Sequence, residues 1–114
     1  MGLKKTVDGN VVVISLEGNI LAGGDASQIH ETVHEELEQG NRYFVLDLSH
    51  VKLINSSGLG ILIGALTAAR NQDGDVRLAA VSEKVAHILE MMHLNKVFEM
   101  YETVDAAKAS YLQA

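Results

Sequence analysis

Apolar residues in this 114-residue chain fall into two kinds of segment that alternate along most of its length. Short runs rich in β-branched residues predict buried strands, and apolar residues spaced three and four positions apart predict amphipathic helices. The predicted strands cover residues 11–16, 43–48, 76–81 and 98–101, and residues 3–8 are expected to form a hairpin with the first of them. The predicted helices cover residues 26–39, from about 57 to a turn at 73–75, 82–92, and from about 104 onward.

This order of elements predicts an α/β fold. After the opening hairpin, strand and helix alternate, which indicates parallel strands joined by helical crossovers. Uninterrupted apolar strands such as "YFVLDL" are typical of a sheet that is covered on both faces. We therefore expect a mostly parallel, mixed sheet of four to five strands with about four helices. The chain contains no proline, low-complexity stretch or internal repeat, so a single domain spanning residues 1–114 is predicted.

Two helices show clear inward faces and end signals. In the helix at 26–39, the inward residues are Ala26, Ile29, Val33 and Leu37, with Asp25 as the expected N-cap and Gly40-Asn41 as the stop. The helix at 82–92 has Ser82 as its expected cap and Val85, Leu89 and Met92 on its inward face. Met91, Met92 and Met100 are interpreted as filler of the core or its edge.

Composition narrows the classes of function. The net charge of −6, from 15 acidic and 9 basic residues, supplies no basic face for phosphates, so nucleic-acid binding is not expected. An acidic surface suits a protein partner that carries positive charge. The absence of cysteine excludes disulfides and thiolate metal sites. No apolar run is long enough for a membrane span and no signal peptide is evident, so a cytoplasmic protein is expected.

The stretch "VKLINSSGLGILIGAL", residues 51–66, carries the strongest functional signal. Binding groups of parallel α/β folds gather at the carboxyl ends of strands, and this stretch follows the strand that is predicted to end at Leu48. Ser56 and Ser57 then lie where the next helix begins. A phosphate on Ser57 would accept hydrogen bonds from the first N–H groups of that helix. The simpler interpretation is that a serine only caps the helix.

The helix that follows has more apolar surface than one contact with a sheet requires. Its apolar residues are Leu59, Leu62, Ile63 and Leu66, widened by Ile61, Ala65, Ala68 and Ala69. Because a single contact needs an arc of about 100°, Ile61 or Ile63 is expected to remain exposed near the serines as a docking patch. Deeper burial of the helix is the alternative. Gly58 and Gly60 are expected to leave the backbone uncovered for a close approach.

The stretch "VLDLSHVKLINSSGLGILIGAL" resembles the signature of the STAS family, named for sulfate transporters and anti-sigma factor antagonists. The resemblance continues through "VRLAAVSEKVAHILEMMHLNKVFEMYETVDAAKAS". A single-domain chain of this kind is similar to bacterial anti-anti-sigma proteins. The resemblance implies that the unphosphorylated protein binds an anti-sigma factor serine kinase and that phosphorylation releases it. It also implies that a PP2C-type phosphatase resets the switch, and that the phosphorylated hydroxyl is Ser57 rather than Ser56.

The resemblance further implies a binding protein without catalytic residues or a cofactor. Its partner-binding residues are then Asp25, Asn55, Ser56, Ser57, Gly58, Leu59, Gly60 and Ile61. Asn55 stands where the family usually has aspartate, and Leu21 stands where it commonly has another, with Asp25 nearby. The alternative is a STAS subunit of a transporter or other complex that is not phosphorylated.

Two further motifs suggest enzyme functions. "HETVH" matches the zinc-protease pattern H-E-x-x-H, in which His30 and His34 would share a metal and Glu31 would act as base. Position 37 is leucine, so the extended pattern is absent, and no metal site is predicted. Gly58, Gly60 and Gly64 approximate a dinucleotide fingerprint, although the third glycine is one place late. No glycine lies two places before either serine, which excludes a serine-hydrolase elbow.

Overall fold

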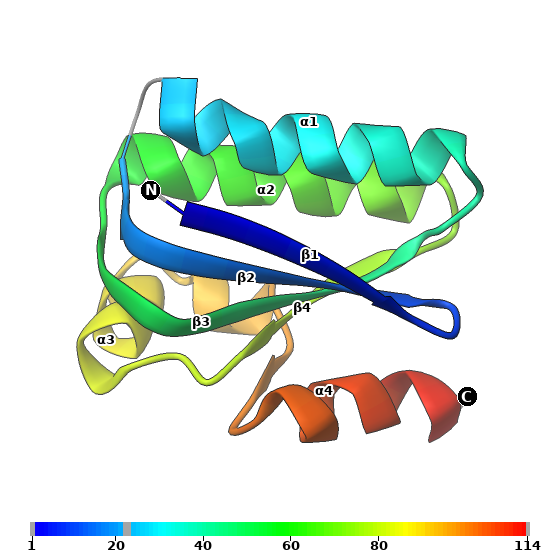
Figure 1. Ribbon diagram of the computed structural model, residues 1–114. Helices are drawn as coiled ribbons and strands as arrows, with labels where there is room; N and C mark the ends of the chain where they lie inside the picture. Colours follow the sequence, from blue (N-terminus) through cyan, green and yellow to red (C-terminus); the bar gives the residue numbers. More distant parts are fainter. Residues whose placement is uncertain (1, 22–23, 114) are drawn as a thin grey trace.

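The computed structural model describes residues 2–21 and 24–113, without the side chains of residues 24–26 and 113. Five strands form one sheet in the order β1-β2-β3-β4-β5 (Figure 1). The strands are β1 (Gly2–Asp8), β2 (Val11–Ile20), β3 (Tyr43–Ile54), β4 (Asp75–Ala79) and β5 (Met100–Tyr101). The α-helices are α1 (Gly24–Glu38), α2 (Ser56–Asn71), α3 (Glu83–Met91) and α4 (Val104–Ser110), and the 3₁₀ turns are η1 (Leu94–Lys96) and η2 (Tyr111–Gln113).

The predicted α/β fold with a mixed sheet is confirmed. β1 pairs antiparallel with β2 through a turn at Gly9, whose φ of 62° suits glycine, and every other strand pair is parallel. Figure 1 shows α1 and α2 covering one face of the sheet and α3 and α4 lying on the other side. This layering explains the continuous apolar strands, because both faces of the central sheet are covered.

β2 and β3 are longer than the sequence predicts. The apolar runs end at Leu16 and Leu48, but pairing continues through Gly18 and Val51 to Ile20 and Ile54, with register shifts on the way. In this extension only every third residue of β3 is buried, so the pattern resembled a loop. β4, in contrast, ends earlier than the sequence predicts. Its last residue is Ala79, because Ala80 has a left-handed φ of 55°. The extended pair carries β3 directly into α2.

The buried apolar side chains form one main cluster and one small cluster. The main cluster joins the sheet to α1 and α2, with Phe44, Leu46, Ile29, Val33, Leu59 and Leu62 among its fully buried members. The small cluster lies under α4 and consists of Val11, Val13, Val45, Ala79 and Ala107. Odd and even residues of β2 thus face different layers, as the period of two along a strand requires.

The helix ends correct two predictions. α1 begins at Gly24, so Asp25 lies in the first turn and not at the N-cap, and its side chain lies outside the described part of the chain. In α3, Ser82 caps the helix and Val85 and Leu89 are buried, as predicted. Met92 was wrongly placed inward. It follows the last residue of α3 and is 49% exposed, and Met91 is 66% exposed, whereas Met100 packs on the main cluster.

Glu36 is a buried carboxylate on α1. Glu36 is 2% exposed and accepts hydrogen bonds from Lys5 Nζ of β1 at 2.8 Å and from Asn41 Nδ2 at 3.0 Å. The hydrogen bond from Lys5 lowers the pKa of Glu36, and burial opposes this by raising it. The interaction ties the edge strand to the helix that covers it.

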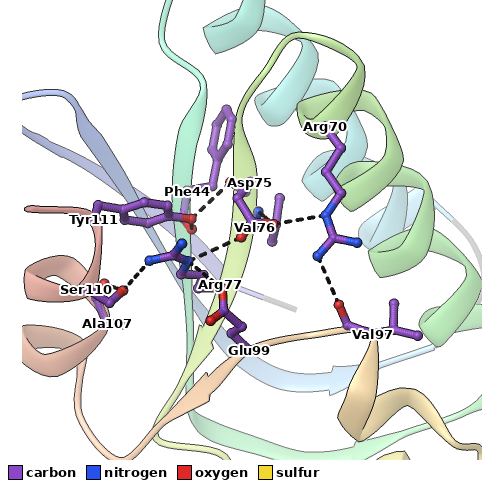
Figure 2. A network of polar contacts seen from close by, with 10 residues as sticks. All are labelled: Phe44, Arg70, Asp75, Val76, Arg77, Val97, Glu99, Ala107, Ser110 and Tyr111. Atoms are coloured by element: carbon purple, nitrogen blue, oxygen red, sulfur yellow. Dashed lines mark hydrogen bonds and ion pairs between the residues drawn. The ribbon is translucent and has the colours of Figure 1, made fainter. Parts of the chain in front are cut away.

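A polar network holds α4 on the opposite face of the sheet (Figure 2). The Arg77 guanidinium of β4 lies 3.2 Å from Asp75, 3.1 Å from Glu99 and 2.6 Å from the Ser110 hydroxyl of α4. It also stacks on the Tyr111 ring, 4.0 Å from its centroid. Burial of the Arg77 head is therefore compensated by carboxylates, a hydroxyl and an aromatic face.

Tyr111 and Arg70 extend this network to neighbouring elements. The Tyr111 hydroxyl reaches the carbonyl oxygens of Phe44 at 2.7 Å and Asp75 at 3.0 Å, and burial raises its pKa. Arg70 of α2 binds the Asp75 carboxylate and donates to the Val97 carbonyl at 3.1 Å (Figure 2). The end of α2, the start of β4 and the C-terminal turn are thereby fixed together.

We expect the Glu36→Gln variant to be less stable than wild type at neutral pH. Because Lys5 holds the pKa of Glu36 below its ordinary value of 4.5, the stability supplied by ionised Glu36 is present above that pH and is lost as the pH falls through the lower pKa of the folded state. Urea unfolding at several pH values should show a deficit at pH 7 that shrinks in acid. Glu35→Gln, at an exposed neighbouring position, is the control, and a deficit independent of pH would contradict the prediction.

Candidate functional site

The junction between β3 and α2 is organised by Asn55. Its extended backbone, with φ −103° and ψ 176°, makes it the N-cap, and its Oδ1 accepts a hydrogen bond from the Gly58 N–H at 2.7 Å. α2 therefore begins at Ser56, one residue earlier than expected, and the interpretation that a serine caps this helix is wrong. An asparagine caps about as well as an aspartate but brings no charge. Ser56 and Ser57 are the first two helical residues, and both are exposed.

The first turn of α2 lies against the carbonyl group of Ile20, at the end of β2. The Asn55 N–H donates to this oxygen at 3.3 Å, and a Cβ atom on Gly58 would overlap the same carbonyl. Gly58 is therefore buried by packing and does not leave backbone uncovered, contrary to the prediction. The contact fixes where the helix starts relative to both strands.

The residues after Gly58 differ in what they offer to a partner. Leu59 is 2% exposed and belongs to the main cluster, so its side chain supports the site from beneath instead of meeting a partner. Gly60 is exposed, and a Cβ atom there would meet nothing within 4 Å. Packing within the chain thus accounts for Gly58 but not for Gly60.

Exposed apolar side chains lie at the ends of β2 and β3, which meet the start of α2. Ile61 and Ile63 are half-buried and pack against the main cluster, so each is less exposed to solvent than the helix pattern predicts. Leu21 and Leu53 are instead 39% and 37% exposed. They flank the paired residues Ile20 and Ile54, at which β2 and β3 end together. Sequence reasoning missed Leu53 because it treated the end of β3 as a loop.

We call this surface the serine face. It consists of Leu21, Leu53, Asn55, Ser56, Ser57, Gly60 and Ile61. The face combines the exposed serine hydroxyls at the start of α2 with apolar side chains and with the uncovered backbone at Gly60. None of its members has an acidic or basic side chain, so it provides no general acid or base. Such an arrangement suits binding, and the alcohols suit modification.

The motifs for enzyme functions gain no support from the geometry. His30 and His34 lie on α1, but no group of three or more metal-ligating side chains occurs within residues 2–21 and 24–113. A surface cavity of about 360 Å³ lies between α1 and the far end of α2, and neither it nor a second cavity beside the β1–β2 turn is lined by the glycines at the start of α2. None of the helices in the described part of the chain is both long and apolar enough to cross a membrane.

Comparison with known proteins agrees with this geometry. Residues 3–107 match the family model described as STAS domain. A Thermotoga maritima protein, provisionally named as an anti-sigma factor antagonist, is 29% identical over 97 residues, which cover 84% of this chain and 86% of the relative.

Solved structures share the fold. The anti-sigma factor antagonist SpoIIAA of Bacillus, described in unphosphorylated and phosphorylated forms, matches with TM-scores of 0.75 and 0.76 at 16% and 20% identity. The two matches cover 99% and 96% of this chain and 99% of the SpoIIAA chains. A sulfate transporter family protein from Wolinella succinogenes matches with a TM-score of 0.80 at 18% identity, over 93% of this chain and 88% of that one.

The two glycines should respond oppositely to substitution by alanine. Gly58→Ala should lower the free energy of unfolding by about 1–3 kcal/mol, because its Cβ would displace the Ile20 carbonyl. Gly60→Ala should raise it by about 0.5–1 kcal/mol, because alanine favours the helix and meets open space. Urea unfolding of both variants provides the measurement. Equal effects at the two positions would show that the contact with Ile20 does not constrain the turn.

Proposed function

Because the chain belongs to the STAS domain family, we propose that it is an anti-sigma factor antagonist controlled by phosphorylation of Ser57. The observation that carries the proposal is the setting of Ser57. Its hydroxyl is exposed at the second position of α2, the capping role is taken by Asn55, and exposed leucines lie at the neighbouring strand ends. The chain would be a kinase substrate and binding protein, not an enzyme.

In the unphosphorylated state, the serine face would dock on an anti-sigma factor serine kinase. Leu21, Leu53 and the exposed part of Ile61 supply the apolar contact that the centre of a protein interface needs. Gly60 lets the partner approach the helix backbone, since no side chain stands there. Binding would occupy the kinase and so free the sigma factor that it holds.

Phosphorylation would end the docking by changing charge and shape. The kinase would transfer the γ-phosphoryl group of ATP to Ser57 Oγ, with loss of the hydroxyl proton and release of ADP. The product carries about −1.5 to −2 charges in the middle of an uncharged face. The first N–H groups of α2 that the Asn55 cap leaves free would donate hydrogen bonds to the phosphate oxygens, so the helix would not have to unfold. A PP2C-type phosphatase, acting in the cytoplasm like the kinase, would restore the alcohol by hydrolysis.

Because Asn55 is uncharged, the negative charge that would end docking comes from the phosphate on Ser57 alone. In a relative with aspartate at the cap, a negative charge would already be present beside the acceptor serine. Here the cap is an amide, and Leu21 adds apolar surface instead of charge. Docking of the unmodified face would therefore rest on apolar contact and shape.

The comparisons support this role at the level of the family. The Thermotoga maritima relative bears the name of an anti-sigma factor antagonist, and SpoIIAA is described in unphosphorylated and phosphorylated forms. A second candidate is a STAS subunit of a transporter-associated complex without phosphorylation. The likeness to the Wolinella succinogenes transporter-family structure and the neutral residues at 21 and 55 favour it.

Ser57→Asp should weaken binding to the cognate anti-sigma kinase by at least tenfold, because it introduces charge into the apolar docking face. Ser57→Ala should bind like wild type and should gain no phosphate when incubated with the kinase and ATP, as read by mass spectrometry. Asn71→Asp, which adds the same charge at the exposed far end of α2, is the control and should bind like wild type. Undiminished binding by Ser57→Asp, or phosphate found only elsewhere, would overturn the switch and leave the transporter-subunit role.

Gly60→Ala should reduce affinity for the kinase by about tenfold although it stabilises the fold, because the added methyl group separates the partner from the helix backbone. Gly64→Ala is a matched control further along α2, where a Cβ atom would meet only His30 Nδ1 at 3.9 Å. Surface plasmon resonance on both variants measures the effect. Wild-type affinity of Gly60→Ala would mean that the partner does not contact α2 at this position.

A further inference from the structure

His30 and His34 lie side by side on α1, outside the serine face. They are separated by one helical turn, both are exposed, and their ring centroids are 4.2 Å apart with an interplanar angle of 54°. Residues four apart on a helix share one face, so this proximity is built into the backbone and does not depend on a loop. The pair is the part of the H-E-x-x-H sequence that neither the fold nor the proposed function uses.

We propose that His30 and His34 form a surface site for one divalent transition-metal ion of the Zn²⁺, Ni²⁺ or Cu²⁺ class, with water as the remaining ligands. Imidazole nitrogen is a preferred ligand of these ions. Bonds of about 2.0–2.1 Å to one ion bring two nitrogens to about 3 Å from each other. Rings whose centroids are 4.2 Å apart reach this separation by side-chain rotation alone.

The charges around the pair favour a cation. Glu31, Glu35 and Glu38 are all exposed on the same helix, and the last turn of α1 contains no basic residue. A divalent ion at His30 and His34 would therefore be attracted by its surroundings as well as by its ligands.

The surroundings also distinguish this site from a metalloprotease centre. The described residues supply no third protein ligand, and position 40, where the extended H-E-x-x-H-x-x-G-x-x-H pattern has its third histidine, is Gly40. His34 borders the cavity of about 360 Å³ between α1 and α2, which leaves room for coordinated water. The site therefore lacks the three protein ligands of a catalytic zinc centre and holds its ion on an open surface.

A competing pair must be separated from the proposed one. Glu38 lies one turn beyond His34 and lines the same cavity, so His34 and Glu38 offer a mixed nitrogen and oxygen site. His30 and His34 are favoured because their rings are in contact and both supply nitrogen. Variants at residues 30 and 38 decide between the two pairs.

The test uses the full chain freed of any affinity tag and of bound metal. Isothermal titration with NiCl₂ and with ZnCl₂ should show saturable binding of one ion per chain, and saturating metal should raise the melting temperature. His30→Ala and His34→Ala should each weaken binding at least tenfold. His87→Ala, at an exposed histidine of α3, should bind like wild type, and Glu38→Gln, which removes only a neighbouring charge, should weaken binding less than either histidine variant. Circular dichroism without metal checks that each variant is folded, and His30→Gln serves if the alanine variant is not.

Three outcomes would overturn the inference. Absence of heat and of a melting shift at millimolar metal would show that the pair does not chelate. Binding that survives His30→Ala but is lost in Glu38→Gln would place the ion at the competing pair. A stoichiometry of one ion per two chains, with dimers in sedimentation, would mean that the histidines bridge copies instead of forming a site on one chain.

Discussion

The seating of the first turn of α2 on the carbonyl group of Ile20 is the constraint from which the serine face follows. The Ile20 carbonyl oxygen accepts a hydrogen bond from the Asn55 N–H. The same oxygen leaves no room for a side chain at Gly58. Because Ile20 pairs with Ile54, the same contact joins the end of β2, the end of β3 and the start of the helix. As a consequence, Ser56 and Ser57 are exposed at the start of α2, and the exposed Leu21 follows directly after Ile20.

Much of the fold could be predicted because its elements are locally consistent. β-branched runs, helical spacing and the Gly9-Asn10 turn each specify their own segment, and alternation of strand and helix specifies parallel pairing. The extension of β3 to Ile54 could not be predicted in this way, because its bulged register removes the alternation by which a strand is recognised. The burial of Glu36 could not be predicted for a different reason. Its burial depends on Lys5, which is 31 residues away in the sequence.

The site was predictable in position and less so in detail. The motif placed Ser57 at a helix start on the carboxyl edge of the sheet, and its hydroxyl is exposed there. Which residue caps the helix was not predictable, since Asn55 and both serines are good caps and only the path of the chain out of β3 selects one. Gly58 and Gly60 look alike in sequence, yet a tertiary contact with Ile20 gives them different roles.

The order of the strands limits the ways in which another chain can bind. β1 and β5 form the two edges of the sheet. β5 is only two residues long, and β1 presents Lys4 and Lys5 along an exposed strand. Short edges and edge lysines are features that oppose strand addition, whether by a ligand peptide or by a second misfolded copy. Both edges therefore disfavour backbone pairing, whether with a binding partner or with further copies of the chain that could aggregate.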